Sequence, residues 1–185
     1  MRRLLPGLVL GLVLLAGCFT PLGTAPPAEA TRSLQTEGPA VIGTTVSFTL
    51  PEYPGRAPHD FLQDRGHVVL LDVWATWCEP CREALPLYQD LLKQYAPRGL
   101  RVYALSVDED PRQIAPFLKG ARVTLPVLLD PNGNIAEKRL QVSMMPTLFV
   151  LDKKGVVRKV HQGFTEGGVG QYQNEIEALL NEPVK

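Results

Sequence analysis

The chain has 185 residues, of which 19 are basic and 19 acidic, so its formal net charge is zero. The charges form no basic stripe, so the sequence gives no support for nucleic acid as a partner. Cys18, Cys78 and Cys81 are the three cysteines. The stabilisation from a cross-link grows with the loop it closes, so Cys78 and Cys81, only three residues apart, favour local chemistry over a structural role.

The first residues resemble an export signal. Arg2 and Arg3 precede an apolar run that ends at Ala16, shorter than the roughly 20 residues of a membrane-spanning helix. The letters LAGC, ending at Cys18, resemble the bacterial lipobox, whose cysteine is acylated and becomes the first residue after cleavage. We therefore predict a lipoprotein signal peptide at 1–17. A plain secretory signal and an uncleaved short anchor are the alternatives.

Lipidation of Cys18 would attach the protein to a bacterial membrane on its extracytoplasmic, periplasmic side. Residues 18–40 are rich in Pro, Gly, Ala and Thr and have no strand or helix period, which predicts a flexible tether. As a flexible coil, such a tether reaches on the order of 25 Å. Residues 41–185 then suit one domain of ordinary size.

Apolar periodicity divides residues 41–185 into alternating strands and helices. The predicted strands cover residues 46–50, 67–73, 100–107, 125–129, 147–152 and 156–161. The predicted helices cover residues 79–96, 110–119, 134–140 and 167–182. This order indicates an α/β fold with a central mixed sheet flanked by helices.

The sequence Cys78-Glu79-Pro80-Cys81 lies where the strand 67–73 gives way to the helix 79–96. Cys78 would occupy the helix N-terminus, where free backbone N–H groups and the helix dipole favour a thiolate. Cys81, one turn further on and less exposed, would resolve the mixed disulfide. Pro80 fits the first turn because its missing N–H costs nothing there. No further cofactor is expected beyond this redox-active disulfide.

Glu79 places a negative charge beside the thiolate and so disfavours the reduced form. An effect of up to about 1 kcal/mol corresponds to roughly 20 mV for a two-electron couple, which favours a reductant over a strong oxidant.

Zinc binding is the competing interpretation of a Cys-x-x-Cys pair. A zinc site needs two further ligands at suitable spacing, and His59, His67 and His161 are scattered singly, so no metal is expected.

Asp72 interrupts an otherwise apolar strand six residues before Cys78. A carboxylate there is costly without a function or a partner. Side chains an even number of residues apart on a strand share a face, so Asp72 should point towards the helix that carries Cys81. A buried carboxyl with a raised pKa could accept the proton of Cys81 during resolution. A carboxyl held by hydrogen bonds near the strand end is the alternative.

Two segments resemble the thioredoxin superfamily and, within it, the exported TlpA/ResA-like branch. They are residues 69–82, VLLDVWATWCEPCR, and residues 144–148, MMPTL. The resemblance extends from about Val41 to Leu180. It implies a thioredoxin-like fold with an N-terminal strand extension, which suits 46–50, and a central strand–helix insert, which suits 111–140.

The resemblance also implies roles for individual residues. Cys78 is the nucleophile and Cys81 the resolving thiol. A cis peptide between Met145 and Pro146 faces the cysteine pair. Trp74 and Trp77 shape the surface around it.

This chain departs from the branch at two positions. Many members carry Glu three residues after the second Cys, where this chain has Ala84, and Glu83 is turned from that direction by about 100°. The branch often has an uncharged residue at the position of Asp72, which is the choice of thioredoxin itself. The proton-transfer role is therefore expected at Asp72.

TlpA/ResA-like proteins typically reduce particular exported proteins, in cytochrome c maturation or metal-site assembly, and a membrane thiol-transfer protein recharges them. The resemblance thus implies exported clients, held by transient mixed disulfides, and a membrane reductant as partners.

Three other functions compete. The peroxiredoxin pattern Pro-x-x-x-Thr-x-x-Cys is absent, because Thr76 lies two residues before Cys78 and not three. A copper-binding thioredoxin-like module normally spaces its cysteines by three residues. A recognition domain with a purely structural disulfide is the last alternative.

Overall fold

The computed structural model describes residues 42–183. The predicted signal peptide at 1–17, the lipidation site Cys18, the tether at 18–40 and the domain boundary at 41 lie outside these residues. Within the described part of the chain, no helix is both long and apolar enough to cross a bilayer.

A seven-stranded mixed sheet forms the centre of the fold, with the strand order β2-β1-β5-β4-β3-β6-β7. The strands are β1 (Thr49–Tyr53), β2 (Pro58–Asp60), β3 (Val68–Trp74), β4 (Leu100–Ser106), β5 (Val127–Leu129), β6 (Thr147–Leu151) and β7 (Val157–Gln162). β3, β4 and β5 are parallel, whereas β6, β7, β1 and β2 each pair antiparallel with their neighbours. The predicted mixed central sheet is therefore confirmed.

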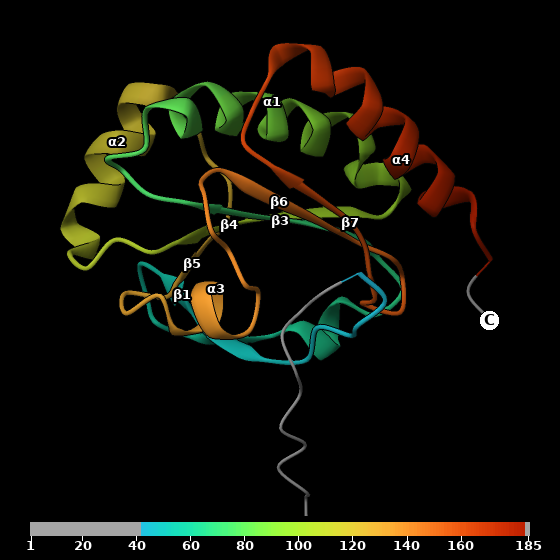
Figure 1. The fold of residues 1–185 in the computed structure, drawn as a ribbon, viewed down its shortest axis with the longest axis horizontal. Coiled ribbons are helices and arrows are strands. Elements are labelled where there is room, and N and C mark those ends of the chain that lie inside the picture. The colour runs from blue at the N-terminus through green and yellow to red at the C-terminus, as the bar shows by residue number, and fades with distance from the viewer. Residues whose placement is uncertain (1–41, 184–185) are drawn as a thin grey trace, which may run out of the picture. The chain divides into compact units, whose positions relative to one another are not determined.

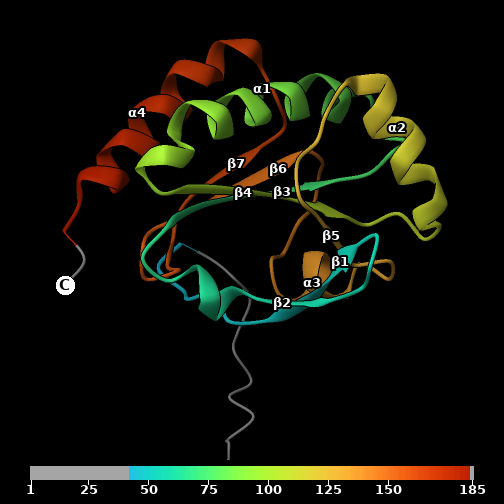
Figure 2. The same ribbon diagram turned by 180° about the vertical axis from the view of Figure 1, so that it is seen from behind.

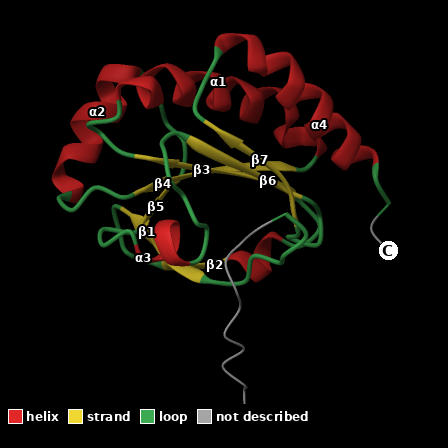
Figure 3. Ribbon diagram, in the orientation of Figure 1, coloured by secondary structure: helices red, strands yellow, loops and turns green. Residues whose placement is uncertain are grey.

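Helices cover both faces of this sheet. They are α1 (Glu79–Tyr95), α2 (Ile114–Ala121), α3 (Asn134–Lys138) and α4 (Val169–Asn181). Figures 1 and 2 show α1, α2 and α4 over one face of the central strands, while α3 lies on the opposite side together with β1 and β2. Figure 3 shows the helices α1, α2 and α4 on one side of the central strands and α3 on the other side, near β1 and β2.

β3 is buried along its whole length, as its apolar run predicts. Leu70 and Trp74 pack into the core beneath α1 and α4, and Leu71 and Val73 pack into the core on the α3 side. Because β3 lies between β4 and β6 and has helices on both faces, its C-terminal end is held firmly in place. The chain passes from that end directly into the Cys-x-x-Cys segment.

The N-terminal strand prediction was wrong in its bounds. The alternation in Val46–Leu50 predicted a strand there, but β1 runs from Thr49 to Tyr53 and Thr45 forms only an isolated bridge with Val156. β1 runs through Pro51, which lies opposite Pro58 of β2. β2 was missed because its sequence, Pro-His-Asp, has no apolar alternation.

A buried polar cluster joins this N-terminal region to β4. The carboxylate of Asp64 accepts hydrogen bonds from Arg101 and from the Tyr103 hydroxyl, and lies 2.8 Å from Nε2 of His59. Burial alone would raise the pKa of Asp64, but the bonds to His59, Arg101 and Tyr103 outweigh it and lower that pKa. The N-terminal extension is thus attached to the sheet through a paired charge as well as through apolar contacts.

Candidate active site

Cys78 and Cys81 form a disulfide at the N-terminus of α1. Cys78 is the N-cap residue, with an extended backbone (φ −87°, ψ 102°), and Pro80 lies in the first turn as predicted. The side chain of Cys78 is 6% exposed, while that of Cys81 is fully buried. Cys78 is therefore the more exposed of the two sulfurs. At that position the helix dipole and the free N–H groups of the first turn favour the thiolate.

Glu79 has less influence on Cys78 than its place in the sequence suggests. Its side chain is 82% exposed, and the guanidinium of Arg82 lies 3.7 Å away on the next turn. Solvent screens an exposed charge, and Arg82 brings a positive charge to the same helix end. The contribution of Glu79 to the reducing character of the pair is therefore smaller than the sequence alone indicates.

The two tryptophans occupy different environments. Trp77 is 69% exposed beside Cys78, whereas Trp74 is fully buried. The Trp74 ring lies 4.9 Å from that of Phe117, and the Arg82 guanidinium covers the same Phe117 ring at 4.5 Å. Trp77 therefore contributes to the surface around the disulfide. Trp74, at an inward-facing position of β3, supports the site from below.

Asp108 holds the turn that leads into Cys78, a contact the sequence analysis missed. Its carboxylate accepts hydrogen bonds from the backbone N–H of Thr76 at 3.0 Å, the Thr76 hydroxyl at 2.7 Å and the Ser106 hydroxyl at 2.9 Å. Asp108 is 4% exposed. The sequence contains a signal for this contact, because Asp108 directly follows the predicted strand 100–107. The parallel strands β3 and β4 end at the same edge of the sheet, so a carboxylate there can reach the turn after β3.

Asp72 lies on the face of β3 that carries Leu70 and Trp74, beneath α1 and α4. Its side chain is fully buried, and neither carboxyl oxygen has a hydrogen-bond partner among the described residues. Burial raises the pKa of Asp72 well above its ordinary value. Its charge also acts on the hydroxyls of Tyr88 from α1 and Tyr172 from α4. The carboxyl is therefore not tied up by hydrogen bonds near the strand end, which was the alternative interpretation.

The two departures from the branch have structural counterparts on α1. Ala84 is fully buried on the face of α1 that also carries Cys81 and Tyr88. Glu83 is exposed and so points away from that face. Glu79 and Glu83 are exposed on α1. Asp72 is therefore the candidate proton acceptor that lies beneath this helix.

The segment before β6 lies beside the end of β3, because Thr147 pairs with Val73. The peptide bond between Met145 and Pro146 is cis. The carbonyl of Pro146 accepts a hydrogen bond from Gly163 at 2.8 Å, and the hydroxyl of Thr147 donates to the carbonyl of Met144 at 2.7 Å. Met145 is half-buried against the core cluster that includes Cys78 and Cys81.

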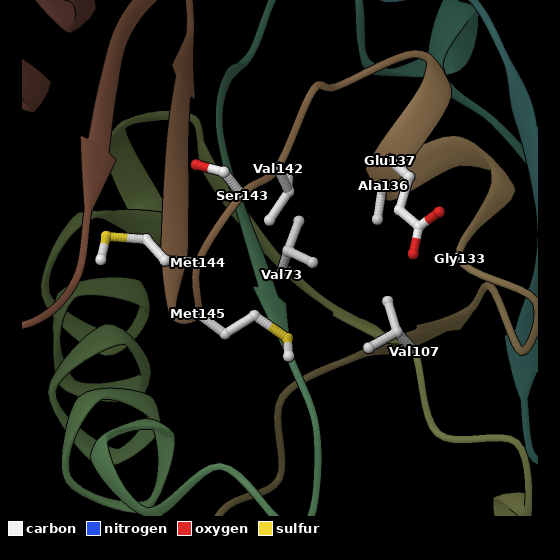
Figure 4. A pocket seen from close by; sticks show the side chains of 9 residues that line it. All are labelled: Val73, Val107, Gly133, Ala136, Glu137, Val142, Ser143, Met144 and Met145. Carbon is white, nitrogen blue, oxygen red and sulfur yellow. The ribbon is translucent and has the colours of Figure 1, made fainter.

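A hollow of about 210 Å³ adjoins this segment. Figure 4 shows Met145 and Met144 pointing in different directions, with Met145 directed towards Val107. The walls are mostly apolar, and Glu137 of α3 contributes a carboxylate. They include Val73, Val107, Ala136, Val142, Met145 and Glu137. Among the described residues, no group of three His, Cys, Asp or Glu side chains could hold a metal ion.

Comparison with known proteins agrees with this geometry. The AhpC/TSA family matches residues 44–160, which is more than half of the chain. The chain belongs to the AhpC/TSA family. Within this thioredoxin-like family, the ResA thiol-disulfide oxidoreductase of Geobacillus thermodenitrificans is 30% identical over 139 residues, which cover 75% of this chain and 79% of ResA. These findings confirm the predicted resemblance and the enzyme class, a thiol–disulfide oxidoreductase with a Cys-x-x-Cys pair.

Two further relatives show how far the likeness extends. The thioredoxin-like protein YneN of Bacillus subtilis is 40% identical over 106 residues, which cover 55% of this chain. The matched part spans 61% of YneN, less than two thirds of its length. The crystal structure of the thiol:disulfide interchange protein DsbE of Chlorobium tepidum superimposes with a TM-score of 0.67 at 29% identity, and covers 78% of this chain and 98% of DsbE. The thioredoxin-like fold is thereby confirmed.

The burial of Asp72 predicts how stability depends on pH. Because the pKa of Asp72 is higher in the folded protein than in the unfolded chain, the folded state binds more protons above about pH 4. The free energy of unfolding should therefore fall as the pH rises from there to the folded pKa. The Asp72→Asn variant lacks this loss, so it should be the more stable protein at neutral pH. Each unit of pKa shift contributes about 1.4 kcal/mol.

Denaturant unfolding of the disulfide form from pH 3 to pH 9 measures this effect as the difference between variant and wild type. The difference should be small near pH 3 and grow as the pH rises. Asp90→Asn, which changes an exposed carboxyl on α1, serves as the control and should give a nearly constant difference. A pH-independent difference for Asp72→Asn would contradict the raised pKa.

Proposed function

We propose that this protein reduces disulfides in exported client proteins, with Cys78 as nucleophile and Cys81 as resolving thiol. The observation that carries the proposal is the difference between the two sulfurs. Cys78, 6% exposed, is the N-cap residue of α1 and the more exposed of the two, whereas Cys81 is fully buried one turn further on. In thiol–disulfide exchange the accessible thiolate makes the first attack and the second thiol releases the product.

The reaction then has two steps. The Cys78 thiolate attacks a client disulfide, forms a bond to one client sulfur and releases the other, which takes up a proton. Cys81 next loses its proton and attacks the Cys78 sulfur. The Cys78–Cys81 disulfide forms, and the second client sulfur leaves as a thiolate. The client gains two electrons and the cysteine pair loses two, so a dithiol reductant must restore the pair. A membrane thiol-transfer protein is the partner we propose for this step.

Asp72 is the proposed acceptor for the proton of Cys81. It lies beneath the helix that carries Cys81, and no hydrogen bond among the described residues holds its carboxylate elsewhere. Burial raises the pKa of Asp72 well above its ordinary value, which makes its carboxylate a stronger base. Removal of that proton makes Cys81 a nucleophile at the moment when it must attack.

The surface around Cys78 supports a protein as the substrate. Trp77, which precedes Cys78, and Met144, which precedes the cis Met145–Pro146 segment, are 69% and 50% exposed. The apolar hollow beside Met145 adds a concave element with one carboxylate, that of Glu137 (Figure 4). We propose that clients present an apolar segment next to their disulfide. Proteins of cytochrome c maturation or metal-site assembly are the proposed client classes.

We further propose that a lipid on Cys18 anchors the protein to a bacterial membrane, with the folded domain on the periplasmic side. The support is the order of a basic start, a short apolar run and LAGC in the sequence. Such a location would place the cysteine pair where exported proteins acquire disulfides.

Trapping should identify the clients. In the full chain carrying Cys81→Ser, the mixed disulfide at Cys78 cannot be resolved, so client proteins should accumulate as covalent adducts. These adducts should appear on non-reducing gels of the expressing bacterium, disappear on reduction, and consist of exported proteins by mass spectrometry. The Cys78→Ser, Cys81→Ser double variant is the control and should form none. The absence of Cys78-dependent adducts would contradict the exchange mechanism.

The role of Asp72 predicts a selective kinetic defect. Asp72→Asn should slow the release of thiol from a mixed disulfide at Cys78 by about 10²-fold, the lower end of what a positioned proton acceptor supplies. The initial attack by Cys78 should remain nearly unchanged. Rapid-mixing measurements between pH 6 and pH 9 separate the two steps, with Glu83→Gln as a control for an exposed carboxyl on the same helix. Equal resolution rates across this range would remove Asp72 from the mechanism.

The proposed lipid anchor predicts that Cys18 carries a fatty acid and that the protein is found with the membrane. Cys18→Ser should abolish incorporation of labelled fatty acid, while Cys78→Ser, with its anchor intact, should retain it. Fractionation of the bacterium should find wild type with the membrane. Fatty-acid labelling that survives in Cys18→Ser, or that wild type lacks, would contradict lipidation at this residue.

A further inference from the structure

The hollow beside Met145 adjoins the cysteine pair through two of its walls. Met145, the residue before the cis peptide bond, packs against the core cluster that contains Cys78 and Cys81, and it also lines the hollow. Val107, on another wall, donates its backbone N–H to the carbonyl of Trp74 at 3.0 Å. Trp74 is the last residue of β3, four residues before Cys78. The hollow therefore lies beside the two segments that hold the disulfide in place.

The hollow has the size and the apolar walls that suit one long side chain. Its volume of about 210 Å³ is below the roughly 300–1,000 Å³ of pockets that enclose a whole small-molecule ligand. Val73 at the end of β3 and Val107 just beyond β4 form one part of the wall. Ala136 of α3 and Val142 form another. An aliphatic chain placed between them would be removed from water, which is favourable.

Among the described residues that line the hollow, Glu137 alone carries a charge. Figure 4 shows its carboxylate directed towards Val107, at the space that Val73 and Ala136 border. The side chain lies over Gly133, where an added Cβ atom would be 3.3 Å from Oε1 of Glu137. The bare backbone at Gly133 thus leaves room for the carboxylate at the hollow.

No cation within residues 42–183 neutralises this carboxylate. Glu137 takes part in none of the ion pairs found among those residues. Lys138, the next residue, donates instead to the side chain of Asn134 at 2.6 Å. A charge beside a concave apolar wall is screened less than one on an open surface, and it raises the local concentration of opposite charge. The hollow is therefore ready to receive a cation.

Asp130 fixes the position of α3 and, with it, that of Glu137. The Asp130 carboxylate accepts hydrogen bonds from the backbone N–H groups of Ile135 at 2.9 Å and Ala136 at 2.8 Å. Its own N–H donates to the carbonyl of Ser106, the last residue of β4, at 2.8 Å. Asp130 is buried, so these bonds are shielded from water. The carboxylate of Glu137 is thus carried by an element that is tied to the sheet.

We propose that this hollow binds a basic side chain of the client, lysine or arginine, and that Glu137 is the residue that selects it. The inference rests on the proposed function and adds a property of its substrates. The aliphatic stem of a basic side chain packs on the apolar walls, while its charged end reaches the Glu137 carboxylate. An apolar side chain fills the same walls but leaves Glu137 unpaired, and an acidic one is repelled. Clients then carry a basic residue near the disulfide that Cys78 attacks.

Disulfide-containing peptides test this preference. The peptides of each set differ at one position near the disulfide, which holds lysine, norleucine or glutamate, and the sets move that position along both sides of the cysteine. Norleucine keeps the aliphatic stem of lysine and removes the charge. The measured quantity is the second-order rate constant with which the reduced full-length protein attacks each peptide. At the best position, lysine should react about fivefold faster than norleucine, the upper end for an ion pair near a surface, and glutamate should be slowest.

Variants of Glu137 separate this contact from the overall charge of the surface. The ratio of the lysine to the norleucine rate constant is taken within each variant, so it does not depend on the fraction of active protein. Glu137→Gln should bring the ratio close to one. Glu137→Lys should reverse the order, so that the glutamate peptide reacts fastest. Glu109→Gln is the matched control and should keep the wild-type ratio, because Glu109 is exposed two residues beyond Val107 and is not among the residues that line the hollow.

The outcomes distinguish a failure of this inference from a failure of the proposed function. If wild type reduces the lysine and norleucine peptides equally at every position, disulfide exchange stands and the subsite for a basic side chain is overturned. A preference for lysine that survives in Glu137→Gln, or that Glu109→Gln removes, also overturns it, because another carboxylate is then responsible. If wild type reduces none of the peptides, the proposed function is contradicted and this inference falls with it.

Discussion

The burial of β3 on both faces is the constraint on which the active site depends. All seven residues of β3 are buried, and β4 and β6 hydrogen-bond along its two edges. The C-terminal end of β3 is therefore held in a fixed position relative to the helices above it. Cys78 follows four residues after Trp74, and Asp108, two residues beyond β4, fixes the intervening turn through Thr76. The accessible sulfur is thus placed by the core of the sheet rather than by flexible surface contacts.

The same burial explains why Asp72 is significant. On a strand covered by helices, a carboxyl cannot reach water by a change of rotamer, and its ionised form is disfavoured. The fully buried Ala84 on the helix above leaves that face of α1 without a second carboxyl near Cys81. In the proposed mechanism one acidic group beneath the pair accepts the proton, and its cost to stability grows as the pH rises towards its folded pKa.

Local sequence patterns predicted the parts of the fold whose patterns are long or unambiguous. The apolar run of β3, the periodic face of α1 and the turn between β6 and β7 each specify their element within a short stretch. β2 was missed because its three residues acquire strand geometry only through pairing with β1. The contacts of Asp108, Tyr88 and Tyr172 were missed for a related reason, because each depends on residues between 30 and 85 positions away that no local pattern brings together.

Thr76 bears on the choice between disulfide exchange and peroxide reduction. In the peroxidase pattern a threonine stands three residues before the reactive cysteine. Here the threonine stands two residues before it, and its hydroxyl donates to Asp108 at 2.7 Å, so it stabilises the turn instead of facing Cys78. Cys81, one helical turn from Cys78, forms a disulfide with it, and Cys81 is fully buried whereas Cys78 is 6% exposed. In the proposed mechanism, the adjacent resolving thiol and the exposed Trp77 next to Cys78 favour a protein disulfide over a small peroxide as the substrate.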